Sequence, residues 1–198
     1  MKIKYSYIFV ALIIASPTLH ADESLLTRIE KLPTDHNFIS WLFTFSRMKG
    51  VKPVNNKTYE DECGACHFPY QPGLLPSASW EKILDAKQLS NHYGDDAELD
   101  EDTRLKILTY LKQNSAEKSW YKRSRKIMAS LDEGQVPMRI TQTPYIKEKH
   151  SEIPEKMIKG NKDVGSLSNC NKCHREAAKG IYDDDTVYIP NYGRNWED

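Results

Sequence analysis

All four cysteines of the chain belong to two short motifs with the pattern Cys-x-x-Cys-His. The motifs are Cys63-Gly64-Ala65-Cys66-His67 and Cys170-Asn171-Lys172-Cys173-His174. On a short helix, two thiols at this spacing can each add to one vinyl group of a haem, and the adjacent imidazole can reach the iron. The sequence therefore predicts two covalently bound haem c groups. Their thioether bonds would involve Cys63, Cys66, Cys170 and Cys173, and their proximal iron ligands would be His67 and His174.

Two other roles for the cysteines have to be weighed. In an exported protein they could form two disulfides, or the two pairs could close a single zinc site. The two pairs of a structural zinc site usually lie about 15 to 20 residues apart, whereas more than a hundred residues separate these two. Neither alternative explains the histidine that follows each pair. Haem attachment explains all three residues of the pattern.

The first 21 residues have the composition of a cleavable secretory signal. Lys2 and Lys4 supply the positive charge, residues 5–15 form an apolar stretch, and Leu19-His20-Ala21 is a suitable cleavage site. The apolar stretch is shorter than a membrane span, and an uncleaved anchor is the alternative. Thioether attachment of haem takes place outside the bacterial cytoplasm. We therefore expect a periplasmic protein that is not inserted in the membrane once the signal is removed.

The charge of the chain argues against a nucleic-acid partner. The sequence has 28 basic and 28 acidic side chains, and removal of Lys2 and Lys4 with the signal leaves 28 − 2 = 26 basic against 28 acidic ones. Four haem propionates would add negative charge, whereas nucleic-acid binding normally requires a clustered basic surface. Apolar residues are sparse for one or two small domains, so two buried porphyrins would supply much of the core.

The residue pattern predicts a mainly α fold with no extended sheet. Thr58 and Asp61 resemble a capping box ahead of the first motif, and Leu105, Leu108 and Leu111 are expected on one helix face. Helices are predicted at residues 24–32, 37–48, 58–67, 79–86, 119–131, 144–150 and 168–180, and one more begins at Asp100 or Asp102.

The predicted organisation has four parts: a signal peptide at 1–21, an N-terminal helical extension at 22–57, a first haem domain at 58–133 and a second at 134–198. Gly134 and Pro137 mark the boundary between the haem domains. One basic cluster falls in the 119–131 helix. Three roles for this cluster are open: a solvated helix face, a partner for haem propionates, or a docking site for an acidic redox protein. The cluster consists of Lys122, Arg123, Arg125 and Lys126.

Each haem iron of an electron carrier needs a second axial ligand, normally His or Met. Outside the signal and the motifs, the chain has His36, His92 and His150. His92 lies in a turn one short helix after the first motif, and His150 closes a helix twenty residues before Cys170. We expect these two as distal ligands, and His36 as an ordinary first-turn residue. The competing methionines, more often core fillers than ligands, are Met48, Met128, Met138 and Met157.

The chain resembles the bacterial dihaem cytochrome c family between Tyr59 and Pro190. The resemblance is carried by four blocks, of which the first is Glu62 to His67 with Tyr70-Gln71-Pro72-Gly73-Leu74-Leu75-Pro76 and Ser79-Trp80. The second is Asn91 to Ala97 with the 105–111 helix, and the third is Pro137 to Thr141 with Pro144-Tyr145 through His150. The fourth is Asn169 to His174 with Ala177 and Gly180. Residues 22–57 fall outside the pattern.

The resemblance implies a periplasmic electron carrier with two bis-His haems, whose N-terminal part is similar to a class I cytochrome c and whose C-terminal part is a smaller haem-bearing unit. Members of this family are thought to accept electrons from a membrane b-type cytochrome or a quinol-linked donor. The implied acceptor is a small soluble c-type haem protein that binds oxygen or related ligands. These partners follow from analogy alone.

Two other functions remain open at this stage. A small dihaem enzyme, such as a peroxidase or a reductase, would keep one iron open and would need His92 or His150 to be a non-ligand. A haem-based sensor or structural subunit would need regulated ligand exchange or a permanent partner. A carrier differs from both because its two irons are six-coordinate and it catalyses no reaction.

Overall fold

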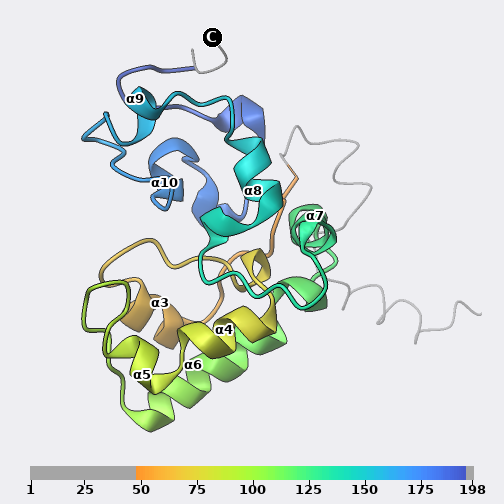
Figure 1. Ribbon diagram of the computed structural model, residues 1–198, viewed down its shortest axis with the longest axis vertical. Helices are drawn as coiled ribbons and strands as arrows, with labels where there is room; N and C mark the ends of the chain where they lie inside the picture. Colours follow the sequence, from red (N-terminus) through yellow and green to blue (C-terminus); the bar gives the residue numbers. More distant parts are fainter. Residues whose placement is uncertain (1–47, 195–198) are drawn as a thin grey trace, which may run out of the picture. The chain divides into compact units, whose positions relative to one another are not determined.

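The computed structural model describes residues 48–194, all of which belong to one compact unit that spans Ser46–Asp198. The predicted signal, the helices at 24–32 and 37–48 and His36 lie outside the described residues. The described chain is mainly α, as predicted, and holds only isolated bridges in place of strands (Figure 1). Within residues 48–194, no helix has both the length and the apolarity that a bilayer crossing requires.

The helix that leads into the first motif, α3 (Lys57–Cys63), begins one residue before the predicted start. The side chain of Asn56, in extended backbone, accepts a hydrogen bond from the amide of Tyr59 at 2.8 Å. That bond satisfies one of the free amides of the first turn, so Asn56 is the N-cap in place of Thr58. Asp61 completes no capping box and instead forms an ion pair with Lys57 at 2.7 Å.

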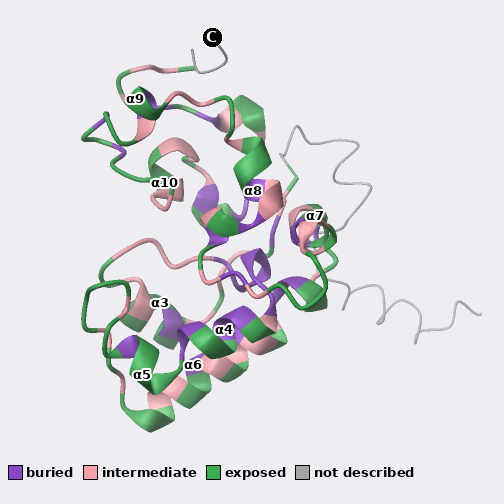
Figure 2. Ribbon diagram, in the orientation of Figure 1, coloured by how far each residue is buried: buried purple, intermediate pink, exposed green. Residues whose placement is uncertain are grey.

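Helices α4 (Ser77–Ile83) and α6 (Glu101–Gln113) pack against each other, and their facing sides are the buried ones (Figure 2). On α6 the buried residues are Ile107 and Leu111, whereas Leu105 is 45% exposed. The prediction that Leu105 shares the buried face was wrong. Residues two apart on a helix point to opposite sides, so Leu105 and Ile107 cannot both face the core.

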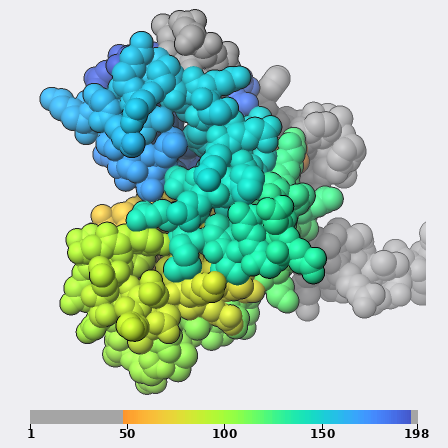
Figure 3. Space-filling model, in the orientation of Figure 1, coloured from red at the N-terminus to blue at the C-terminus, as the bar shows by residue number. Residues whose placement is uncertain are grey.

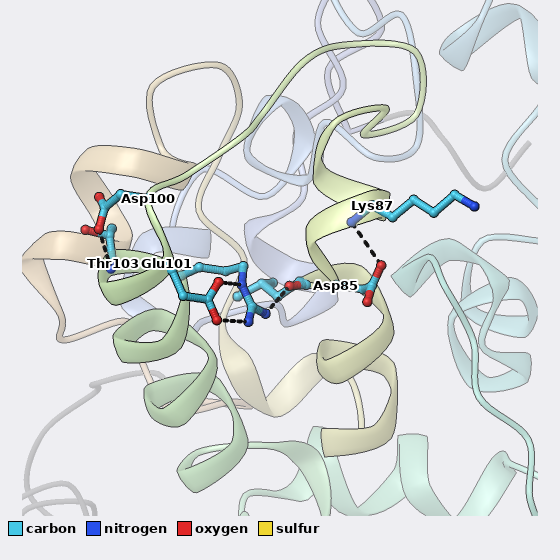
Figure 4. Close-up of polar contacts among 7 residues, drawn as sticks. Asp85, Lys87, Asp100, Glu101 and Thr103 are labelled. Carbon is cyan, nitrogen blue, oxygen red and sulfur yellow. Dashed lines mark hydrogen bonds and ion pairs between the residues drawn. The ribbon is translucent and has the colours of Figure 1, made fainter.

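Side-chain caps begin the two helices that flank the loop that carries His92 (Figure 4). Asp85 caps α5 (Ala86–Leu89) by accepting a bond from the amide of Lys87 at 3.0 Å. Asp100, one of the two predicted caps, begins α6 by accepting from the amide of Thr103 at 3.0 Å. Each cap contributes about 1 kcal/mol. The loop between residues 90 and 100 therefore lies between two capped helices, and the amide of Ala97 donates back to the carbonyl of Leu89 at 2.9 Å.

The chain then passes through η3 (Ala116–Lys118) to α7 (Lys122–Ser130), which packs on α8 (Pro144–Lys149) and on η2 (Pro72–Leu74). The predicted short helix that ends at His150 is confirmed as α8, with Pro144 in its first turn and His150 as its C-cap. A further 3-10 turn, η4 (Ile140–Gln142), precedes α8.

The last third of the described chain has only short helical pieces. They are α9 (Glu155–Ile158), α10 (Cys170–Cys173), η5 (Ala177–Lys179) and η6 (Asp184–Thr186). The continuous helix predicted from 168 to 180 is wrong, because the backbone of His174 (φ −91°, ψ 86°) leaves the helical region. Gly180 does end the segment, in the left-handed region at φ 76°.

The main apolar core draws on both sides of the predicted boundary at 133/134. Ile107 and Trp80 share it with Ile146 and Ala177. A smaller cluster lies in the last third and contains Met157, Val164, Val187 and Ile189. Figure 3 shows the 140s of the chain, in teal, against both the yellow-green and the blue segments. The boundary at 133/134 and the class I character of the first domain stay predictions.

Candidate functional site

The first motif brings the ring of its histidine near that of His92. Cys63 ends α3, and the ring of His67 lies 6.3 Å from the ring of His92, centre to centre, with 14° between the two planes. His67 Nδ1 is 2.8 Å from the carbonyl oxygen of Phe68. A carbonyl only accepts, so the proton is on Nδ1 and Nε2 keeps its lone pair for a metal ion.

A four-residue turn delivers His92 to this position. The amide of His92 donates to the carbonyl of Asp95 at 2.7 Å, and the amide of Asp95 donates back at 3.3 Å. Tyr93 (φ 59°) and Gly94 (φ 114°) occupy the two central positions, as in a type I′ turn. A left-handed tyrosine is uncommon. It is held by a hydrogen bond from its hydroxyl to the Met138 carbonyl and by the guanidinium of Arg139, 3.8 Å from its ring centre.

The second motif pairs its histidine with His150. The ring centres of His174 and His150 are 6.1 Å apart, but the planes are nearly perpendicular at 79°. His150 Nδ1 lies 2.7 Å from the carbonyl oxygen of Ile146, one turn earlier on α8, and this bond again leaves Nε2 as the acceptor. His174 Nδ1 is buried, with no hydrogen-bond partner within residues 48–194.

Both histidine pairs have the separation that one metal ion requires. Two metal–nitrogen bonds of about 2 Å, plus about 1.1 Å from each nitrogen to its ring centre, place two ligating imidazoles about 6 Å apart. All four cysteines are free, so no disulfide competes for them. No cluster of three or more His, Cys, Asp or Glu suited to a metal occurs among residues 48–194. The residues present fit haem iron.

Burial favours the neutral form of three of the four histidines. It lowers the pKa of His174 to about 4, with His150 and Arg123 adding to the shift, and it also lowers the pKa values of His150 and His92. A neutral imidazole is the form that binds metal, so these three histidines do not have to lose a proton at neutral pH. Burial also raises the pKa of the unattached Cys63 thiol to about 11, as it does for Cys170.

The family model described as dihaem cytochrome c matches residues 59–182. The chain belongs to the dihaem cytochrome c family. As a dihaem cytochrome it is an electron-transfer protein with two covalently bound c-type haems. These haems account for both Cys-x-x-Cys-His motifs.

Solved structures agree with this assignment. The dihaem cytochrome is 39% identical to the diheme cytochrome type c of Shewanella baltica OS155, with a TM-score of 0.58 over 71% of this chain and 97% of that one. It is 35% identical to the diheme cytochrome c of Rhodobacter sphaeroides, with a TM-score of 0.59 over 67% of this chain and 100% of the other. No curated protein matches the chain.

Two adjacent residues connect the two haem sites of the dihaem cytochrome. The ring of Tyr70 stacks on His67 at 5.0 Å, and its hydroxyl donates to the Ser168 carbonyl at 2.7 Å, two residues before Cys170. Gln71 is fully buried. Its Nε2 donates to the Ala177 carbonyl at 2.5 Å, and its Oε1 accepts from the hydroxyl of Tyr182 at 2.6 Å.

The structure therefore brings His92 to the first motif and His150 to the second, and their roles as distal ligands stay predictions. Met48 is 72% exposed, whereas Met157 packs in the small apolar cluster. A cavity of about 340 Å³ borders His92, and its lining includes Ile83 and Met138. It lies on the side of the site where the predicted distal ligand sits.

The sequence reasoning did not single out Gln71, Tyr182 or the inward position of Arg123. For Arg123 a signal existed: it lies four residues before Ile127, which is fully buried, so both belong to the inner face of α7. For Gln71 the signal was weaker. It is a polar residue within an apolar, proline-rich loop, and its two partners are more than a hundred residues away along the chain.

Proposed function

We propose that this dihaem cytochrome is a periplasmic electron carrier in which each iron is held between two histidines, His67 with His92 and His174 with His150. The observation that supports the proposal most is the spacing of the two imidazole pairs, 6.3 and 6.1 Å between ring centres. The haems, when bound, supply a one-electron iron couple. The chain contributes ligands that fill both axial positions.

Two features of the ligands suit a carrier. First, backbone carbonyls orient His67 and His150 through Nδ1, so that each ring is fixed before and after a change of charge. Second, His92 is carried by a turn that is hydrogen-bonded at both ends. Rigid ligands limit the rearrangement that accompanies gain or loss of an electron, and filled coordination leaves no position for a substrate.

Single replacements of the distal histidines test the proposal. His92→Ala and His150→Ala are each expected to convert one haem to high spin and leave the other low spin, with carbon monoxide bound only at the altered haem. His36→Ala, which removes the third candidate, is the matched control and is expected to change neither haem. Visible and electron paramagnetic resonance spectra of the purified proteins measure the result.

Two results would contradict this assignment. If neither His92→Ala nor His150→Ala alters a haem spectrum, the ligands are other residues. If the unmodified protein already binds carbon monoxide when reduced, one iron is open, and a dihaem peroxidase or reductase becomes the better description.

For partners, we propose a membrane b-type cytochrome or quinol-linked donor and a small soluble c-type haem acceptor; family resemblance alone supports both. Stopped-flow mixing tests them. Membrane vesicles with reduced quinol are expected to reduce the protein, and the reduced protein to reduce the acceptor. Failure of either step at micromolar concentrations would remove that partner. Periplasmic location is tested by fractionation, with recovery of the haem-loaded protein in the cytoplasm as the contrary result.

A further inference from the structure

The basic cluster of α7 is divided between the surface and the interior. Lys122, Arg125 and Lys126 are exposed, as a solvated helix face requires. Arg123 is half-buried and shares its helix face with Ile127 and Ser124, both fully buried. The guanidinium of Arg123 is therefore partly buried, whereas the other three side chains of the cluster are exposed.

Four contacts of the guanidinium and one of the backbone amide fix this residue. Arg123 Nη2 donates to the carbonyl of Tyr182 at 2.6 Å, and Nη1 donates to the hydroxyl of Tyr145 at 3.3 Å. The charged carbon lies 5.4 Å from the ring centre of Tyr182 and 5.8 Å from that of Tyr145. Its backbone amide donates to Gly50 at 2.9 Å. None of these partners is a carboxylate, so the charge is held by dipoles and aromatic faces.

Both tyrosines belong to the second haem site. The ring of Tyr182 lies 5.1 Å from the ring of His174. Tyr145 is on α8, the helix that ends at His150. The positive charge of Arg123 is accordingly held against two rings that adjoin this site, one beside His174 and one on the helix that leads to His150.

We propose that Arg123 is a positioning residue that raises the reduction potential of the haem attached at Cys170 and Cys173. The oxidised haem carries one more positive charge than the reduced haem, so a fixed cation nearby destabilises the oxidised form. In a partly buried, low-dielectric setting that repulsion is much less screened than at a surface. The charge comes from α7, on the other side of the predicted domain boundary, so the first part of the chain tunes the second.

The test compares two neutralised arginines on the same helix. Arg123→Gln removes the inner charge, and Arg125→Gln removes an exposed charge two residues away. Arg123→Gln is expected to lower the reduction equilibrium constant of the second haem about tenfold, which is about 59 mV for one electron, and to leave the first haem unchanged. Arg125→Gln is expected to change neither appreciably. Redox titrations followed by electron paramagnetic resonance measure each haem, with the signal lost in His150→Ala identifying the second.

Arg123→Lys separates charge from shape. It keeps the charge and loses the planar fork, so the second haem is expected to retain most of its potential. The effect of Arg123→Gln is also expected to persist at high salt, because a partly buried charge is poorly screened. Arg123→Met, which keeps the stem, is a second neutral variant should Arg123→Gln fail to yield a dihaem protein.

Three results would overturn the proposal. They are an unchanged second-haem potential in the neutral variants, an equal drop in Arg125→Gln, and an equal drop in Arg123→Lys. The inference requires the second haem to lie at His174, and it does not depend on which partner proteins the cytochrome has. Failure of the distal-ligand proposal would appear instead as unaltered spin states in His92→Ala and His150→Ala.

Discussion

The two predicted haem sites have similar histidine pairs but rest on different amounts of protein. The first is built on α3, α4 and the 13-residue α6, which pack around the main apolar core. The second is built on α8 and on α9 and α10, of four residues each, beside a cluster of four buried side chains. Helices of one turn are not stable alone. The second site therefore depends more on its haem and on the first region.

Loss of one haem is expected to give the largest difference between the two regions. Cys170→Ala/Cys173→Ala removes the second haem, and most amide protection in residues 150–194 is expected to disappear, because that segment has its own cluster of four buried side chains and adds only Ala177 and Tyr182 to the buried residues of the main core. Cys63→Ala/Cys66→Ala is the matched variant. In it, amides of α4 and α6 are expected to stay protected. Hydrogen exchange read by mass spectrometry measures both, and equal losses in the two variants would show that the regions do not differ.

Removal of Gln71 is the next largest change. Gln71→Leu leaves the Ala177 carbonyl and the Tyr182 hydroxyl without their partner in a buried setting. The free energy of unfolding is expected to fall by about 2 to 3 kcal/mol. Gln113→Leu, at an exposed position on α6, is the control and is expected to change it by about 0.5 kcal/mol or less. Denaturant unfolding measures the free energy of unfolding of each variant. A similar decrease in both variants would show that the hydrogen bonds of Gln71 do not stabilise the contact between the two sites.

The smallest expected difference between the two sites comes from the angle between the imidazole planes of each histidine pair, and it does not affect stability. If both histidines of a pair ligate iron, each imidazole would donate π density to the d orbital perpendicular to its plane. The 14° angle of the first pair would then favour one orbital, whereas the 79° angle of the second would leave two orbitals nearly degenerate. The oxidised protein is expected to show two low-spin signals, with greater g anisotropy for the second haem. Two identical signals in an electron paramagnetic resonance spectrum would contradict the geometry.

Local chemistry made part of this protein predictable from its sequence. The two Cys-x-x-Cys-His motifs predicted two covalently bound haems, which the family confirms, and Pro144 and Asp100 marked helix starts that the structure confirms. Contacts across long separations were beyond reach. The pairing of Tyr182 with Gln71 leaves no local periodic signal, and the spacing of Arg123 from Ile127 indicates an inward face without naming Tyr182 as its partner. The one-turn length of α10 was also missed, because His174 has to leave the helix to face His150.

The pairing of Gly50 with Gly180 has a consequence for how the protein is made. Both the Gly50 and Val51 amides donate to the Gly180 carbonyl, and a side chain at 180 would lie 2.1 Å from the Val51 carbonyl oxygen. These partners are 180 − 50 = 130 positions apart. At about 5 to 20 residues per second, the ribosome makes the second one about 6 to 26 seconds after the first. The hydrogen bonds of residues 50 and 51 to Gly180 thus cannot form until nearly the whole chain has been synthesised, whereas the first attachment motif is synthesised within seconds of these residues.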